Sequence, residues 1–581
     1  MKSHWLISIL FLFFAITAKA QNAGLNHEVY FFDDIQGFSK KVKSTNKFKD
    51  SLSLINYANS LQNYFHKKGC WQAEFKIDRV DTISFKLNFY VGNVFNIKKL
   101  SYGNLPYHVA KLIDFKSRYY SGKPYNHSQL ANTFYKAVIE AQNTGHPFAS
   151  IGLDSIQFHD SNTFSASVNY QAGSFITFDT LFIATKGKVK RSFIENYLRI
   201  KPGYPFDYRK YKNIRQRLNA LPFLNVNGDI NLFFTESRSR IEIPLIVKKA
   251  NVVDGVVGFL PNPSKKGSFM FTGEFNLQLR NLFQSGKTIK VEWKSFQQQS
   301  QSLILNYTHP LVFATPLELD FVFDFFKQDS SFYTLQRKLS VAYQFNSGAK
   351  FYYRLAFNSS RTGTLNQLKG SKTLPSVVDN DIITNGFGFD YIRYDNFNFP
   401  RSGIKVKIDI SAGNKIIIKN ANFDPIAYEK IQLSTPQYKA DFYFDKFFKL
   451  APNTTVQFKT FASKIFNKQL FQNDLYRLGG LKTMRGFNEN FFYASEFLIS
   501  GVELRQYFDN SSYVLLFFEQ SALGYKLVDK SFSDKPSGLG AGLSFETGPG
   551  VFTFIYSLGN SSVQKMNFNQ SRIHFGLISR F

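Results

Sequence analysis

The residues best suited to a specific polar interaction lie in the segment Leu478–Phe487, which reads Leu-Gly-Gly-Leu-Lys-Thr-Met-Arg-Gly-Phe. Glycines allow backbone conformations and close approaches that other residues resist. An arginine held between them can direct its planar guanidinium at a carboxylate in a two-pronged contact. The alternative is an ordinary exposed loop whose arginine is solvated. The two interpretations differ in what surrounds Arg485, so the rest of the chain decides between them.

Sequence signatures of catalysis are absent elsewhere. The chain has no G-x-S-x-G, H-E-x-x-H or P-loop pattern, and its nine histidines lack ligand spacing. Gly538–Gly542 superficially suggests a nucleotide loop, but polar and apolar residues keep alternating through it, which favours a bent or thin strand. The single cysteine, Cys70, is interpreted as a buried or partly buried thiol. We therefore expect no enzyme, no catalytic residue, no metal and no cofactor.

The elements that position Arg485 are predicted to be transmembrane strands. From Asn251 to Phe581 no convincing helix appears, and segments such as Phe271–Leu279, Leu317–Phe326 and Thr455–Ala462 alternate between polar and apolar residues. Such segments of about 10 residues are typical of outer-membrane barrels, and roughly 20 residues per strand and connection gives about 16 strands. A soluble all-β sandwich or propeller is the rival. The aromatic content of 17% and the chain end favour the barrel.

The N-terminus is typical of an export signal. Lys2 precedes the apolar run Leu6–Thr17, and Ala18-Lys19-Ala20 fits a cleavage site. Residues 1–20 are thus predicted to be a signal peptide, with a membrane anchor as the alternative. The formal net charge of +29 is compatible with nucleic acid, an anionic membrane surface or acidic glycolipid. Export, and the spread of the charge along the whole chain, argue against nucleic acid.

Between these regions a helix–strand pattern recurs three times. Apolar residues spaced as on a helix precede an alternating strand in each copy, and the helix-to-strand junctions fall at Gly69, Gly145 and Pro222, at almost equal intervals. The predicted units are residues 26–91, with an atypical opening half, 92–172 and 173–250. They resemble POTRA domains. A small sheet with a free edge can accept an extended peptide as an added strand, although the edges could instead pack against neighbouring units.

Several motifs in the C-terminal region occur in the order of a known family. They are Asn281–Gly286, Tyr307–Pro310, the Asp395-Asn396-x-x-x-Phe-Pro400-x-x-Gly403 segment, the Gly479-Gly480 to Arg485-Gly486-Phe487 segment, and a terminal strand with Phe575, Gly576 and Phe581. With the repeats, this succession resembles the outer-membrane protein assembly factor superfamily with POTRA domains (BamA/TamA-like, bacterial surface antigen family).

The resemblance implies roles for particular residues. The Arg-Gly-Phe loop would fold back into the barrel, where Arg485 would meet acidic side chains, for which Glu503 and Glu519 are the candidates. The family usually has Asp-x-Gly where this chain has Glu519-Gln520-Ser521. The resemblance also implies that the terminal aromatic strand is a barrel recognition signal. Arg485 would then pin the loop and set the barrel shape.

The resemblance further implies location and function. The chain would lie in the outer membrane of a Gram-negative bacterium with its N-terminal domains in the periplasm. It would receive unfolded outer-membrane or secreted client proteins and insert or export them, through a seam between the first strand, near Val252–Leu260, and the last, Ser571–Phe581. Implied partners include outer-membrane lipid or lipopolysaccharide and accessory periplasmic or lipoprotein subunits. The alternative function is a passive channel or structural barrel that the repeats only tether.

Overall fold

The computed structural model describes residues 25–580 except 35–36, 42–46, 82–83, 262–268, 298–299, 346–347, 364–369, 397–398 and 548–549. The predicted signal peptide at 1–20 and Phe581 lie outside these residues. The chain folds as two compact units. One comprises the chain up to Thr177 with Pro205–Arg209 and Phe234–Ser239, and the other comprises Phe178–Tyr204, Lys210–Phe233 and the chain from Arg240 onward. The predicted 173–250 domain contributes to both.

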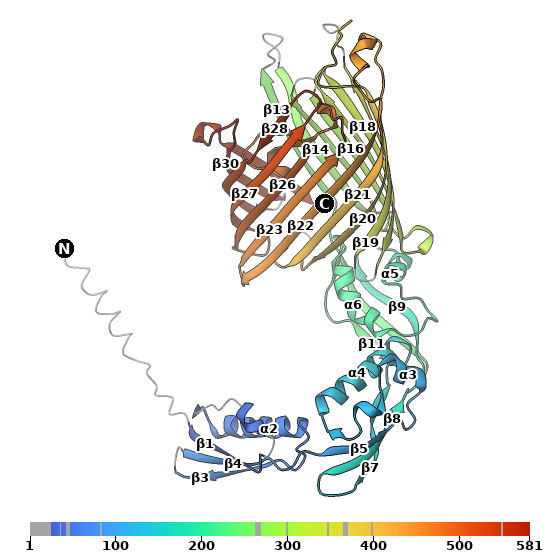
Figure 1. Cartoon of the computed structure of the whole chain (residues 1–581), viewed down its shortest axis with the longest axis vertical. Coiled ribbons are helices and arrows are strands. Elements are labelled where there is room, and N and C mark those ends of the chain that lie inside the picture. Colours follow the sequence, from blue (N-terminus) through green and yellow to red (C-terminus); the bar gives the residue numbers. More distant parts are fainter. Residues whose placement is uncertain are drawn as a thin grey trace, which may run out of the picture. The chain divides into compact units, whose positions relative to one another are not determined.

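The first two small sheets share one plan, in which amphipathic helices cover one face (Figure 1). The first has the strand order β2-β1-β4-β3 and the second β6-β5-β8-β7. Their elements are β1 (Leu25–Phe32), η1 (Phe38–Lys41), β2 (Lys47–Phe48), α2 (Ser51–Lys67), β3 (Glu74–Arg79), β4 (Ser84–Tyr90), β5 (Asn96–Ser101), α3 (Tyr107–Leu112), η2 (Ser117–Tyr119), β6 (Lys123–Pro124), α4 (His127–Asn143), β7 (Ser150–Phe158) and β8 (Thr163–Gln171).

Local sequence explains these helices. Asp50 caps α2 by accepting a hydrogen bond from the Ser53 N–H at 2.8 Å, and Asn126 caps α4 by accepting from the Gln129 N–H at 3.1 Å. The helical spacing of Leu54, Ala58, Leu61 and Phe65 turns all four toward the sheet, where they are buried. Cys70 lies in the same core and is fully buried.

The third sheet has β12 (Arg238–Val247) at its centre, paired with β9 (Thr177–Lys186), β10 (Leu224–Val226) and β11 (Asn231–Phe234). Its helices are α5 (Arg191–Leu198) and α6 (Tyr208–Asn219). Ile241, Ile243 and Leu245 alternate along β12 with more exposed residues and are buried. No helix in the described part of the chain has the length and apolarity that a membrane crossing requires.

The remaining strands form an antiparallel barrel of 16 strands with an unsealed seam, which confirms the predicted fold class (Figure 1). Its strands are β13 (Val252–Pro261), β14 (Phe269–Leu282), β15 (Lys287–Gln297), β16 (Ser300–His309), β17 (Leu317–Gln328), β18 (Phe332–Gln344), β19 (Lys350–Thr362), β20 (Asn380–Tyr394), β21 (Gly403–Ile417), β22 (Ser434–Ala451), β23 (Thr454–Phe466), β26 (Glu496–Tyr507), β27 (Tyr513–Lys526), β28 (Ser531–Asp534), β29 (Ser537–Glu546), β30 (Val551–Asn560) and β31 (Arg572–Arg580). Both β28 and β29 pair with β27 on the same side, so they continue one wall strand that is interrupted at Lys535 and Pro536.

Side chains alternate between the two faces of the wall. On β27, Val514, Leu516 and Phe518 are exposed on the outside, whereas Leu515, Phe517 and Glu519 between them are buried. The interior also carries many polar side chains, as is typical of transmembrane barrels. A lumen cavity of about 640 Å³ is lined largely by charged side chains of β16–β23. The apolar outer surface and the charged interior fit a wall that stands in lipid.

The seam has the shortest described register of any strand pair in the barrel wall. β13 pairs with β14 over ten residues, from Val252↔Gln278 to Pro261↔Phe269. The described pairing of β13 with β31 comprises Val252↔Arg580, Val253↔Ser579 and Asp254↔Ile578. We call the end of the barrel where the chain enters β13 the proximal end, and the other the distal end. The three pairs lie at the proximal end.

Candidate functional site: a loop anchored in the barrel lumen

The segment that carries Arg485 connects β23 to β26 and folds into the barrel. We call residues 467–495 the lumen loop. It contains η6 (Gln472–Asp474), a small hairpin of β24 (Tyr476–Leu478) and β25 (Phe492–Ala494), and the single turn α7 (Gly480–Thr483). The loop leaves and rejoins the wall at the distal end. Its tip nevertheless contacts residues in the middle of β26 and β27.

Arg485 is held by two buried carboxylates. Its backbone N–H donates to Glu519 Oε2 at 3.0 Å, and its Nε donates to Glu519 Oε1 at 2.7 Å. Its Nη1 donates to Glu503 Oε2 at 2.6 Å. The guanidinium carbon also lies 3.5 Å from the centre of the Phe517 ring. The side chains of Arg485, Glu503 and Glu519 are 5%, 8% and 2% exposed, so water screens these contacts little.

Two further cations balance the carboxylates. Lys459 Nζ lies 2.7 Å from Glu519 Oε1, and Arg505 Nε donates to Glu503 Oε1 at 2.8 Å. Each carboxylate therefore has a partner on the barrel wall in addition to Arg485. A buried charge without a partner is costly. The wall partners stabilise both acids, and Arg485 ties them to the loop.

Glycines bring the loop backbone into direct contact with the wall backbone. Gly486 adopts φ = +96°, and a Cβ atom there would lie 2.7 Å from the Gly559 nitrogen. A Cβ on Gly559 would lie 2.6 Å from the Gly486 oxygen, and one on Gly538 would lie 2.3 Å from the Arg485 oxygen. Real Cβ atoms almost never approach so closely. The glycines of β29 and β30 thus form the surface on which the loop rests.

The remaining motif residues shape the loop. Gly479 and Gly480 have φ of +132° and +78°, conformations that favour glycine. Thr483 closes the turn, because its hydroxyl accepts from the Gly479 N–H at 2.8 Å. Phe487 is 1% exposed and packs in a cluster of apolar residues from the loop and the wall. These residues fix the backbone on either side of Arg485.

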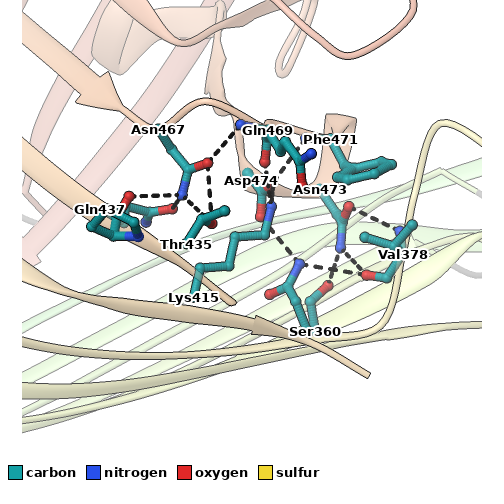
Figure 2. Close-up of polar contacts among 12 residues, drawn as sticks. Ser360, Val378, Lys415, Thr435, Gln437, Asn467, Gln469, Phe471, Asn473 and Asp474 are labelled. Carbon is teal, nitrogen blue, oxygen red and sulfur yellow. Dashed lines mark hydrogen bonds and ion pairs between the residues drawn. The ribbon is translucent and has the colours of Figure 1, made fainter. Parts of the chain in front are cut away.

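A second attachment holds the opening half of the loop, near the distal end (Figure 2). Lys415 of β21 forms an ion pair with Asp474, and the two side chains are 0% and 1% exposed. Lys415 Nζ also donates to the Gln469 oxygen at 3.0 Å. Asn473 Nδ2 donates to Ser360 Oγ at 2.7 Å and to the Val378 oxygen at 2.8 Å. The loop is therefore bound to the wall at both halves.

The Asp395–Gly403 motif lies elsewhere, in the proximal turn between β20 and β21. Asp395 Oδ1 accepts from the backbone N–H groups of Asn396, Arg401 and Ser402 at 2.9, 3.0 and 3.1 Å. Pro400 and Gly403 complete the turn, Gly403 with φ = +129°. The motif shapes a hairpin connection.

The C-terminal residues lie on β31. Phe575 is 59% exposed on the outer face, and its ring centroid is 5.9 Å from that of Phe552 on β30. Gly576 has open space where a Cβ would stand. The predicted recognition role of this strand stays a prediction.

Several residues of the site were not identified from the sequence. They are Lys459, Arg505, Phe517 and Gly559, and the anchor of Lys415 with Asp474. The only local signal is glycine within a strand, which marks a close backbone approach. Gly538 was assigned on that ground to a bent or thin strand, and it does lie in β29.

Comparison with known proteins agrees with this geometry. The model of the Omp85 superfamily domain matches residues 281–581. CdiB from Acinetobacter baumannii is similar in structure, with a TM-score of 0.54 and 13% identity over 91% of this chain and 97% of that chain. CdiB from Escherichia coli has a TM-score of 0.55 and 11% identity over the same shares. BamA from Haemophilus ducreyi lacking POTRA domains 1-3 has a TM-score of 0.42 and 13% identity over 84% of this chain and 100% of that chain. No curated protein matches the chain.

Proposed function

The chain belongs to the Omp85 superfamily of outer-membrane barrel proteins, and on that premise we propose that it receives unfolded client polypeptides and inserts or exports them through its barrel. The superfamily supports a role in outer-membrane protein insertion or secretion.

The first step is capture of the client by strand pairing in the periplasm. The first sheet has the strand order β2-β1-β4-β3, so β3 lies at one edge and pairs with β4 from Glu74↔Tyr90 to Arg79↔Phe85. On its other side, β3 has no strand partner within the described part of the chain. A free strand edge can bind an extended peptide through backbone hydrogen bonds with little demand on its sequence. Client proteins, outer-membrane lipid or lipopolysaccharide, and accessory periplasmic or lipoprotein subunits are the proposed partners.

The second step takes place at the seam, and the short register between β13 and β31 is the observation that carries the proposal. Three residue pairs hold these strands together, against ten between β13 and β14. Separating them breaks few hydrogen bonds and exposes two edges that can template an incoming strand. The wall can thus open sideways at one place.

A disulfide that closes the seam reversibly tests this step. Val253 and Ser579 lie directly opposite in the seam register, so cysteines at both positions can form a disulfide across it. Cells that depend on the locked protein should lose barrel proteins from the outer membrane, and reduction should restore them. The single variants serve as controls. Normal outer-membrane barrels and normal secretion under full locking would contradict the proposal.

The passive-channel alternative makes a different prediction. A tethered pore needs neither the sheets nor the seam, so its conductance would persist without residues 26–250 and with the seam locked. Depletion of the protein would then leave both barrel levels and secretion unchanged. The lumen loop, which packs against the wall inside the barrel, favours the transport proposal over an open pore.

A further inference from the structure

The lumen loop contacts both sides of the seam. Lys482, in α7 at the loop tip, donates from Nζ to Glu292 Oε2 of β15 at 3.0 Å, and it lies 3.7 Å from Glu274 Oε1 of β14. Glu489, farther along the loop, lies 4.0 Å from Lys294 of β15. Strands β14 and β15 follow β13 directly in the wall. These contacts attach the loop to the first-strand side of the seam.

A short polar chain continues from Lys482 to the seam itself. Glu274 accepts from Asn276 Nδ2 at 2.9 Å, and the same amide donates to Asp254 Oδ1 at 2.6 Å. Asp254 lies on β13 and forms the last described pair of the seam, opposite Ile578. The loop tip is therefore connected through two side chains to the residue at which the seam pairing ends.

The same loop tip is fixed to the last-strand side. Arg485, three residues after Lys482, binds Glu503 of β26 and Glu519 of β27. The Gly486 oxygen accepts from Gln564 Nε2 at 3.2 Å, and Gln564 lies in the connection between β30 and β31. Gly486 also packs against Gly559 of β30. One turn of chain thus joins the strands that flank the seam on both sides.

We propose that the lumen loop is a clasp that holds the seam closed from inside the barrel, with Lys482 as the positioning residue on the first-strand side. Lateral separation of β13 from β31 carries Glu274 and Glu292 away from Glu503 and Glu519. Because the loop is bound to both sets of acids, it must release one of them. The Arg485 contacts are buried, whereas the Lys482 side chain is 57% exposed. Lys482 is therefore the attachment that yields first.

This inference rests on the proposed opening of the seam, but hydrogen exchange tests it without a client. Backbone amides at the seam exchange when the seam opens, at a rate that follows the open population. Lys482→Glu replaces the attraction to Glu292 and Glu274 by repulsion. We expect exchange in Val252–Asp254 and Ile578–Arg580 of the full chain, in lipid nanodiscs, to become about fivefold faster, the low end of the effect of a lost polar contact. The double variant Lys482→Glu with Glu292→Lys should restore slow exchange.

The matched control is Lys464→Glu. Lys464 forms an ion pair with Glu496 on neighbouring strands, with side-chain exposures of 49% and 53%, similar to that of Lys482. It bridges β23 and β26, which are adjacent, so its loss should leave seam exchange unchanged. Seam exchange that is unaltered in Lys482→Glu, or that rises equally in the remote strands β18–β21, would overturn the clasp. If Lys482→Glu speeds exchange at the seam but a disulfide across the seam leaves client assembly intact, the clasp is supported and the proposed function is contradicted.

Discussion

Arg485 and Glu519 are joined twice, once through the Arg485 backbone N–H and once through its guanidinium Nε. The first bond does not depend on the side chain at position 485. A substitution of the arginine therefore removes the guanidinium contacts and leaves the backbone bond to Glu519 in place. The backbone bond that remains limits the loss of barrel stability expected when Arg485 is replaced.

Replacing Arg485 by alanine should loosen the lumen loop and lower barrel stability. The change removes a buried cation from two acids, for which the cost is about 3–5 kcal/mol. Because Lys459 and Arg505 still neutralise the acids, we expect the lower end, about 3 kcal/mol. The measurement is the temperature at which the folded barrel changes its mobility on gels. The control Arg361→Ala breaks the half-exposed ion pair with Asp381 and should change this temperature little. A variant that folds and complements a deletion as the unmodified protein does would refute the pinning role.

A methyl group on Gly559 should displace the loop. In Gly559→Ala the added Cβ would stand 2.6 Å from the Gly486 oxygen and 2.8 Å from Phe487 Cζ, which leaves it no room. Gly576→Ala is the matched control, since nothing lies within 4 Å of its Cβ. We expect faster proteolysis of the lumen loop and a destabilisation of about 1–3 kcal/mol in the first variant only. Equal behaviour of the two would show that the loop does not rest on β30.

Substitutions of the buried partners Lys415 and Asp474 should have strongly non-additive effects on the free energy of unfolding. Lys415→Met leaves Asp474 charged and buried, at a cost of about 3–5 kcal/mol in the free energy of unfolding. Adding Asp474→Asn removes that charge and keeps an acceptor for the Phe471 N–H, which donates to Asp474 at 2.8 Å. The double variant should therefore regain most of the loss, as urea titration of the protein in lipid vesicles would reveal. Additive effects of the two substitutions would mean that the pair is not a unit.

Cys70 should resist alkylation in the folded chain. Burial, with a smaller effect of the Asp34 charge, raises the pKa of its thiol to about 11. At pH 8 the reactive thiolate should therefore be about a hundredfold scarcer than at an exposed cysteine. Above about pH 9 the unfolded chain ionises first, so the free energy of unfolding should fall as pH rises toward 11. Iodoacetamide labelling checks the first expectation, with Asn59→Cys on the exposed face of α2 as the reactive control.

Patterns within single elements were predictable from the sequence. The helical spacing of Leu54, Ala58, Leu61 and Phe65 predicts the face of α2 that is buried in the structure. The alternation along Leu317–Phe326 predicts a strand, and this segment lies in β17. Helix and strand periodicity are local properties, so a single sequence contains them. The opening half of the first domain has no such pattern, and there the structure has the short η1 and β2.

Contacts between distant elements were less predictable. The family resemblance placed Arg485 with Glu503 and Glu519, and the structure brings the three together. Nothing in the sequence pairs Lys415 with Asp474, Lys459 with Glu519 or Lys482 with Glu292, because these partners meet only after the barrel has closed around the loop. Lumen-facing charges recur on many wall strands, among them the strands that line the cavity, so spacing alone does not select one partner.

The strands at the seam are also short. β31 has nine residues, whereas β22 has 18. At about 3.3 Å per residue the first is about 30 Å long. When tilted by about 40° the described part of β31 covers about 23 Å of depth, close to the apolar band of about 25 Å on such barrels. β22 reaches well beyond that depth. The described part of β31 therefore spans the apolar layer with little length to spare, and a thicker bilayer would have to compress its lipid tails beside the seam.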